Sequence, residues 1–402
     1  MSLIDQLSSE SAWKRFREYK SLHSLMSIRE FEVLDTYIAE KRYLNVTGDM
    51  VFSYPKKKLI NKSGSQKKRV IYTYEEDESW VLKLLSFLMF RYDHLFEDSL
   101  YSFRRRRTVK KAIRSLISIR NLREKYVLKL DVHDYFNSMP VDRLCEEFER
   151  YITDDDRLLE FLKYLFTQNK CYFNGELITE ERGAMAGMPL SAFCANIYLS
   201  DMDRHFSGMN VPYYRYSDDI LLVADTYEEI IEHFGYIKDH LNEKGLTINE
   251  EKTFIYEPHE SFDFLGFKYD DGLIDLSDAT VKKMKDKIAR KSRSLYRWRI
   301  KKGASYEKAA TVLIRKMNDK YYDFEGDNEF TWSRWFFPVL TTDKGLKVLD
   351  SYLLEYVRYL YSGRHYKGNY KVTYDDIKKM GYHSLINEYY RFRNDKRSGG
   401  TP

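Results

Sequence analysis

The chain has 402 residues, and 67 Lys and Arg against 62 Asp and Glu leave a formal net charge of +5. This length suggests two or three domains or one large chain with several lobes, and 43% hydrophobic with 32% charged residues is typical of a globular protein. The sequence shows no apolar run of about 18–20 residues, no secretion signal and no paired cysteine framework, so we expect a cytoplasmic protein without membrane contact.

The predicted elements begin with helix over residues 1–50, where apolar residues recur every three or four positions. Residues 51–75 predict a β-hairpin, with strands over 50–54 and 69–74 and a Lys- and Gly-containing turn over 61–66.

Helices and short strands alternate after this hairpin. Helices are predicted over residues 76–125, 141–170 and 227–244, and a Gly/Pro turn followed by a helix over residues 183–205. A strand that ends in an acid, a second hairpin and a further strand are predicted over residues 126–131, 213–223 and 262–269. From about residue 276 onward the pattern is helical and basic.

Basic residues gather over residues 56–69, 101–125 and 281–302, which hold seven, ten and eleven Lys and Arg residues. One such block is more often a solvated helix face. Three blocks with interleaved aromatic residues instead favour a nucleic-acid surface, because cations neutralise phosphates and aromatic rings stack on bases. The candidate nucleic-acid contacts are Arg104, Arg105, Lys287, Arg290, Lys291 and Arg297.

Acidic residues stand at two predicted strand ends. Asp131 closes the strand over 126–131, and Asp218 and Asp219 lie near the turn of the second hairpin. Because successive strand side chains point to opposite faces, we expect one of these two neighbours to share a site with Asp131 and the other to support it. Clustered carboxylates need a cation, and a pair of Mg²⁺ ions would suit nucleotidyl transfer. An ordinary polar hairpin turn is the alternative.

Residues 51–270 resemble the fingers and palm of reverse transcriptases, with seven sequence blocks in the order of that family. The blocks are KKRVIY, LFEDSLYSFRRRRTVKKAI, LKLDVHDYFNS, GAMAGMPLSAFCANIYLSDMD, YSDD, GLTINEEKT and FDFLGF. The resemblance implies an α+β right-hand polymerase fold with an antiparallel palm sheet. It implies an N-terminal helical extension over residues 1–50, fingers and palm over 51–270, and a basic helical thumb and C-terminal region over 271–402.

The resemblance also implies roles for individual residues. Asp131, Asp218 and Asp219 would be catalytic and would hold two Mg²⁺ ions, with the carbonyl of Val132 as a further ligand. Lys252 would protonate pyrophosphate, with a solvated lysine as the alternative. The candidate deoxynucleotide site consists of Lys67, Arg69, Phe136, Ala186 and Gly187, and the candidate primer grip consists of Phe264, Leu265 and Gly266.

Phe136 follows Asp131 by five positions, where a bulky ring would crowd a ribose 2′-hydroxyl and so favour deoxynucleotides; an ordinary core Phe is the alternative. The family's Pro-Gln-Gly is Met185-Ala186-Gly187 in this sequence. Ala186 therefore lacks the amide that normally lies near the nascent base pair.

We therefore predict an RNA-directed DNA polymerase that resembles the retron-like and defence-associated unknown-group branches of prokaryotic reverse transcriptases. The resemblance implies a role in anti-phage defence, with dNTPs, a structured noncoding RNA template and a DNA product as partners. It leaves a homo-oligomer or a partner protein open. Two alternatives are a polymerase-shaped RNA-binding module whose catalysis is dispensable, and template-independent or protein-primed DNA synthesis.

Overall fold

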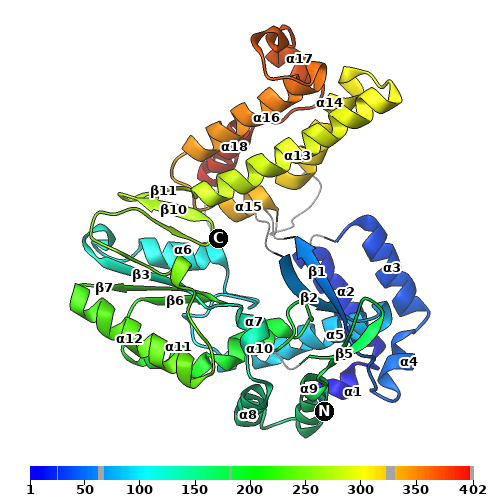
Figure 1. Cartoon of the computed structure of the whole chain (residues 1–402), viewed down its shortest axis with the longest axis vertical. Helices are drawn as coiled ribbons and strands as arrows, with labels where there is room; N and C mark the ends of the chain where they lie inside the picture. Colours follow the sequence, from blue (N-terminus) through cyan, green and yellow to red (C-terminus); the bar gives the residue numbers. More distant parts are fainter. Residues whose placement is uncertain (25, 62–67, 181–182, 323–330, 399–402) are drawn as a thin grey trace. The chain divides into compact units, whose positions relative to one another are not determined.

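The chain divides into two compact units, each described by itself. The computed structural model describes residues 1–24, 26–61, 68–180, 183–322 and 331–398 (Figure 1). The first unit comprises residues 1–21 and 26–260, and residues 261–402 belong to the second. The boundary between the units therefore precedes residue 261, earlier than the expected end of the fingers and palm at residue 270.

The N-terminal residues form short helices that belong to the first unit. These helices are α1 (Leu3–Gln6), α2 (Glu10–His23), α3 (Ile28–Ala39) and α4 (Tyr43–Thr47). Ser2 and Ser27 begin α1 and α3 as capping boxes, which explains why the predicted helical stretch is interrupted. The buried carboxylate of Asp155 accepts hydrogen bonds from the Ser2 hydroxyl (2.6 Å) and the Leu3 N–H (2.7 Å). The start of the chain is therefore fixed to the core.

A mixed sheet with strand order β2-β1-β4-β5 follows. Its strands are β1 (Lys56–Asn61), β2 (Lys68–Thr73), β4 (Lys170–Phe173) and β5 (Glu176–Thr179). The predicted hairpin is correct for its second strand, whereas the first strand lies at 56–61 instead of 50–54. Phe52 explains this shift, because its ring is buried between Tyr74 and Phe161 and the apolar segment around it packs instead of pairing. Residues 62–66 of the predicted turn lie outside the described residues.

Short 3₁₀ helices lie among the remaining α-helices of the first unit. They are α5 (Glu76–Leu88), η1 (Met89–Leu95), α6 (Val109–Ile117), η2 (Leu122–Glu124), α7 (Tyr135–Ser138), α8 (Val141–Tyr151), α9 (Asp156–Thr167), α10 (Ser191–Tyr198), α11 (Ser200–Gly208), α12 (Tyr227–Glu243) and η3 (Glu250–Lys252).

An antiparallel sheet with order β6-β7-β3-β8 carries the predicted acids. Its strands are β3 (Tyr126–Asp131), β6 (Tyr213–Tyr216), β7 (Asp219–Ala224) and β8 (Phe254–Tyr256). The predictions of a strand over 126–131 and of a second hairpin are confirmed. Leu128, Leu130, Ile220 and Leu222 are fully buried, so the sheet is anchored in the core, and α12 packs against β3 and β7 (Figure 1).

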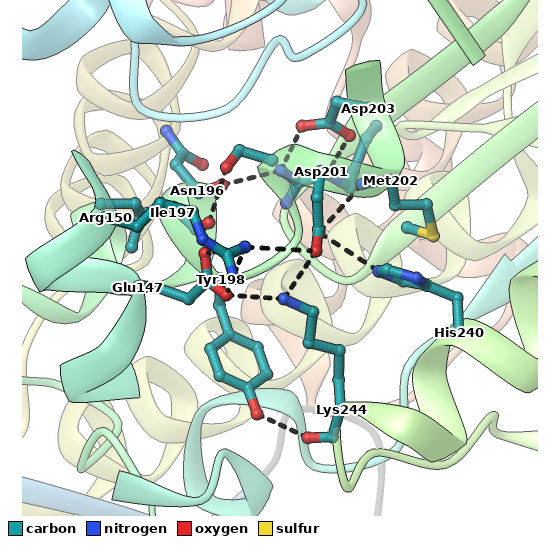
Figure 2. Close-up of polar contacts among 12 residues, drawn as sticks. Glu147, Arg150, Asn196, Ile197, Tyr198, Asp201, Met202, Asp203, His240 and Lys244 are labelled. Carbon is teal, nitrogen blue, oxygen red and sulfur yellow. Dashed lines mark hydrogen bonds and ion pairs between the residues drawn. The ribbon is translucent and has the colours of Figure 1, made fainter. Parts of the chain in front are cut away.

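A network of charged side chains joins α8, α11 and α12 (Figure 2). The ammonium of Lys244, at the end of α12, lies 2.8 Å from Glu147 Oε1 and 2.7 Å from Asp201 Oδ2. His240 Nε2 lies 3.2 Å from the other Asp201 oxygen. The hydrogen bonds and charges of His240 and Lys244 outweigh burial and hold the pKa of Asp201 well below its usual range. The network therefore requires Asp201 to be ionised.

The second unit combines a small sheet with long helices. Its elements are β9 (Phe262–Phe264), β10 (Phe267–Asp270), β11 (Leu273–Leu276), α13 (Asp278–Lys302), α14 (Tyr306–Tyr321), α15 (Trp332–Phe336), α16 (Lys344–Ser362), η4 (Lys367–Lys371), α17 (Tyr374–Lys379) and α18 (Leu385–Ser398). The single strand predicted over 262–269 is wrong, because Leu265 and Gly266 have φ values of 51° and 87° and turn the chain between β9 and β10.

The predicted α+β class is confirmed, since helices and both parallel and antiparallel strand pairs are present. Among the described residues, none of the helices combines the length and the apolar character required to cross a bilayer.

Candidate active site

The acids predicted from the sequence meet at one end of the β3–β7 strand pair. Asp131 of β3 lies directly opposite Asp219 of β7, and directly opposed residues of an antiparallel pair share one face. Asp218 lies in the turn before β7, where its carbonyl accepts a hydrogen bond from the Val132 N–H at 3.0 Å. The register thus places Asp219 across from Asp131 and Asp218 beside both.

The pKa values of Asp218 and Asp219 are both raised. Burial, followed by the charge of Asp131, raises the pKa of Asp218. Burial, followed by the charges of Asp218 and Asp131, raises the pKa of Asp219 to about 6. Lys252 partly offsets both shifts, and Arg69 lowers the pKa of Asp218. Such a cluster is stabilised by added positive charge.

Asp131 is held by a segment that crosses the end of β3. Its carboxylate accepts hydrogen bonds from Lys252 Nζ (2.7 Å) and Asn249 Nδ2 (3.1 Å), and its carbonyl accepts one from the Asn249 N–H (2.7 Å). The His133 N–H donates to the carbonyl of Thr247 at 2.8 Å. Because Asp131 is 6% exposed and both of its carboxylate oxygens have partners, its orientation is fixed.

The donor set at this site suits a hard divalent cation, because carboxylates are the ligands that such ions prefer. Within the described part of the chain, no group of at least three His, Cys, Asp or Glu side chains already surrounds a point that a metal ion could occupy. In the structure, Asp131 is instead paired with Lys252, whose ammonium supplies the positive charge beside this carboxylate. A bound metal ion would therefore compete with Lys252 for Asp131.

A loop beside the acids brings together most of the candidate deoxynucleotide site. The Phe136 carbonyl accepts a hydrogen bond from the Ala184 N–H (2.7 Å), and the Asn137 side chain accepts one from the Ala186 N–H (3.1 Å). The Ala186 carbonyl accepts a hydrogen bond from the Tyr72 N–H of β2 at 2.8 Å. The loop is therefore held between α7 and β2.

Gly187 allows this loop to approach β2. Its φ is +96°, and a Cβ atom at this position would lie 3.2 Å from both Ile71 Cβ and the Tyr72 carbonyl oxygen. Arg69 is on the same strand, and its charge acts on Asp218. Phe136 is half-buried beside Tyr135, with ring centroids 5.8 Å apart. Lys67 lies outside the described residues.

Arg104 and Arg105 have positions that the sequence did not predict. The Arg104 side chain is 6% exposed, and its guanidinium is held by the Asp93 carboxylate (2.8 Å) and by main-chain carbonyls. Arg105 is exposed but lies over the rings of Phe87 and Phe90, 4.8 Å from each. The prediction of a nucleic-acid contact is corrected for Arg104, because its guanidinium is enclosed by these partners.

The candidate primer grip and the C-terminal basic residues belong to the second unit. Phe264 is buried, and Leu265 and Gly266 form the turn before β10. The Gly266 carbonyl accepts hydrogen bonds from the Ser277 N–H (3.0 Å) and the Thr280 hydroxyl (2.9 Å). These bonds fix the turn against the start of α13.

Helix α13 carries the remaining basic candidates, with Arg290 and Arg297 exposed and Lys287 and Lys291 half-buried. Burial and the charges of Lys320, Lys291 and Arg290 lower the pKa of Lys287. Burial and neighbouring cations also lower the pKa of Lys291. This crowding of like charges is relieved when a polyanion binds.

Several polar residues in this part of the first unit were missed from the sequence. Asn249 donates to the Asp131 carboxylate, Asn196 donates to the Ser102 carbonyl, and Arg215 is paired with Asp203. The only sequence signal was an arginine within the otherwise apolar and aromatic strand that precedes YSDD.

Comparisons with known proteins agree with these observations. The model of the family described as "Reverse transcriptase (RNA-dependent DNA polymerase)" matches residues 55–269. The retron Ec86 reverse transcriptase of Escherichia coli is 24% identical over 167 residues, which are 40% of this chain and 48% of that protein. The chain thus spans about half the length of this curated relative.

Solved structures of telomerases show a distant likeness. Apo telomerase from Candida tropicalis, truncated from the C-terminal domain, has a TM-score of 0.45 and 16% identity, over 56% of this chain and 55% of that chain. Telomerase from Candida albicans in complex with a TWJ fragment of telomeric RNA has a TM-score of 0.44 and 15% identity, over 92% of this chain and 71% of that chain.

Proposed function

Because the chain belongs to the reverse transcriptase family, whose model matches more than half of it, we propose that it extends a primer with deoxynucleotides on an RNA template. The family also confirms the predicted right-hand polymerase fold. The observation that carries the proposed activity is the register that brings Asp131 opposite Asp219, with Asp218 in the adjoining turn.

Members of this family use divalent metal ions, and we assign Mg²⁺ to this protein. Asp131, Asp218, Asp219 and the Val132 carbonyl would hold two ions, which supply activation of the primer hydroxyl and stabilisation of the leaving pyrophosphate. Lys252 lies beside Asp131 and is the proposed proton donor to pyrophosphate. Arg69 presents a guanidinium fork suited to triphosphate oxygens.

The loop with Ala186 and Gly187 and the ring of Phe136 form the proposed sugar and base side of the site. Phe136 would exclude a 2′-hydroxyl by its bulk, and Gly187 lets backbone approach the nucleotide without a side chain in between. Ala186 has no side-chain amide to bind the base pair. The shape of the site would therefore control the selection of the incoming nucleotide there.

The template and the product would contact the second unit. We propose that Arg290 and Arg297 bind phosphates, together with the half-buried Lys287 and Lys291, and that the turn over Phe264, Leu265 and Gly266 holds the primer. We also propose a structured noncoding RNA as the template and anti-phage defence in the cytoplasm as the setting, as the sequence resemblance to retron-like and defence-associated reverse transcriptases implies.

Primer extension tests the proposed activity. Purified protein with Mg²⁺, dNTPs and primed RNA is expected to incorporate labelled deoxynucleotides, and Asp218→Asn is expected to abolish incorporation. The matched control is Asp225→Asn, an exposed acid just after the same strand that is paired with Lys125, where activity is expected to persist. Full incorporation by Asp218→Asn would contradict the assignment of the site.

A polymerase-shaped RNA-binding module is the second candidate, and the absence of an amide at Ala186 favours it. Under this alternative, a protein with both Asp218→Ala and Asp219→Ala keeps the biological activity of the parent, measured as protection of cells against phage. Loss of biological activity in the double variant, with unchanged RNA binding, would remove this candidate.

A further inference from the structure

A buried ion pair includes Arg215, which lies just before the turn that leads from Ser217 and Asp218 to Asp219 of β7. Arg215, on β6, and Asp203, on α11, are both 0% exposed, and Arg215 Nε donates to Asp203 Oδ1 at 2.7 Å. A well-packed apolar pair is often as stable as a buried ion pair of similar volume. Stability alone therefore does not explain this ion pair. The other contacts of Arg215 suggest a role in positioning neighbouring segments.

The guanidinium of Arg215 closes the C-terminal end of α10. This helix ends at Tyr198, and the last carbonyls of a helix need donors from outside its regular hydrogen-bond pattern. Arg215 Nη1 and Nη2 donate to the carbonyls of Ala195 and Asn196, each at 3.0 Å. Figure 2 labels Asn196 of α10 and Asp203 of α11, two of the residues that Arg215 contacts. A cation at this position also complements the negative end of the helix dipole.

The same group reaches the turn that holds the acids. Arg215 Nη1 lies 3.5 Å from the carbonyl of Ser217, a long contact. A second bridge is shorter: the Ser217 N–H donates to the Ser102 hydroxyl (3.0 Å), which donates to the Asn196 side chain (2.9 Å). Ser217 has φ +61°, a conformation that a serine keeps only where its surroundings impose it. The turn is therefore held in place from α10.

Helix α10 also contacts the nucleotide side of the site. The Ser191 hydroxyl, at its first residue, donates to the carbonyls of Ala184 (2.9 Å) and Met185 (2.8 Å). The Tyr135 hydroxyl donates to the Ala195 carbonyl at 2.7 Å, next to the arginine contact. One guanidinium thus connects the turn of the acids with the helix that supports the loop of Ala186.

We propose that Arg215 and Asp203 are positioning residues, which fix Asp218 and Asp219 relative to the nucleotide loop. The proposal rests on the proposed polymerase function. Arg215 is fully buried and acts through Ser217 and through the carbonyls of α10. Replacing the planar guanidinium of Arg215 by the single ammonium nitrogen of a lysine should therefore misplace the acids while the protein stays folded.

Two variants test this assignment. Arg215→Lys keeps the charge that Asp203 needs but loses the fork, and Arg215→Met combined with Asp203→Leu leaves no charge unpaired. Both variants are expected to keep the circular dichroism of the folded parent. A misplacement of about 1 Å costs up to about 100-fold in rate, so kcat is expected to fall about 10- to 100-fold. The KM for primer–template should stay within about twofold, because the duplex is bound elsewhere.

Metal affinity supplies a readout that does not depend on turnover. Titration with Mn²⁺, followed by electron paramagnetic resonance, is expected to show weaker binding in both variants than in the parent. Arg42→Lys is the matched control, because Arg42 forms a fork with Asp77 among the N-terminal helices. Its kcat and Mn²⁺ affinity are expected to match those of the parent.

The outcomes separate the two proposals. If the parent binds Mn²⁺ but does not extend primers, the proposed function fails, while the Mn²⁺ titrations still test the positioning role. If the parent is active and the charge-free double variant equals it in kcat and Mn²⁺ affinity, the ion pair serves stability alone and the positioning role is wrong.

Discussion

Asp219 is a residue whose ionisation opposes folding when no cation is present. Its pKa rises to about 6 in the fold, above the ordinary value of 3.8. The folded protein therefore binds this proton more tightly than the unfolded chain, and the associated stability is lost as the pH rises through about 6. At neutral pH the ionised group lowers the free energy of unfolding by up to about 3 kcal/mol.

Asp219→Asn is accordingly expected to stabilise the protein at pH 8 in the presence of a chelator, and to change stability little at pH 4. Urea unfolding at both pH values measures this difference. Asp225→Asn, at an exposed position, is expected to change stability by less than about 1 kcal/mol at either pH. A stabilisation by Asp219→Asn that is equal at pH 4 and pH 8 would contradict the role of ionisation.

The acids could be predicted from the sequence at the residue scale because they end strands and lie in ordered blocks. Their supporting partners could not. Asn249, Asp203 and Arg215 act through contacts between segments distant in the sequence, and no local pattern encodes such contacts. Arg104 illustrates the converse, because a run of arginines resembles a surface while this guanidinium is enclosed by Asp93 and carbonyls.

At the scale of elements, the loop over Ala186 and Gly187 depends on its closeness to β2. Gly187→Ala is expected to destabilise the protein by about 1–2 kcal/mol and to raise the KM for dNTP, because the new methyl group presses on Ile71 and on the Tyr72 carbonyl. Chemical denaturation and dNTP titration measure both effects.

Gly175→Ala is the matched control, because Gly175 has a similar φ of +91° but has no atom within 4 Å of a Cβ at that position. It carries the backbone strain without the contact and is expected to leave the KM for dNTP unchanged. An equal effect of the two substitutions on this KM would show that the approach to β2 does not matter.

The charged network between α8, α11 and α12 gives a second prediction at this scale. Lys244→Met removes the ammonium partner of the buried Glu147 and leaves it the exposed Arg150, so the expected loss in unfolding free energy is about 1–3 kcal/mol, less than for an unpaired buried charge. Thermal and urea denaturation measure the loss. Lys163→Met, which removes an exposed partner of Glu149, is expected to cost less than about 1 kcal/mol; equal losses would contradict the importance of burial.

Helix and strand types were largely predictable because apolar periodicity is local. The first and last residues of these elements were less predictable where tertiary packing determined them. The segment around Phe52 has the composition of a strand, but the ring is buried against Tyr74 and Phe161. Residues 56–61, which begin with three lysines, form the strand instead. The aromatic residues that recur over 262–269 concealed the turn at Leu265 and Gly266.

At the scale of the whole molecule, the chain has two units, and the basic helix α13 belongs to the second. Replacing both exposed arginines, Arg290→Gln with Arg297→Gln, is expected to lower the slope of log affinity against log salt by about 1.4–1.8, since each phosphate contact contributes about 0.7–0.9. Fluorescence anisotropy with a primed RNA at several salt concentrations measures this slope.

The control replaces two exposed cations of α2, Lys14→Gln with Arg15→Gln, and is expected to leave the slope unchanged. A slope that is the same for the α13 variant and the parent would remove these arginines from the proposed phosphate contacts. The change to basic helices suggested a division near residue 270, and in the structure the small sheet of β9, β10 and β11 lies with those helices in the second unit.

The anchoring of Ser2 and Leu3 to Asp155 has a practical side for laboratory work. An affinity tag fused directly before Met1 would be separated from α1 by only two residues. One of these, Ser2, is hydrogen-bonded to Asp155, the residue that caps α9. Expression vectors that add a tag at this end therefore need a flexible spacer, so that purification does not loosen the first helix.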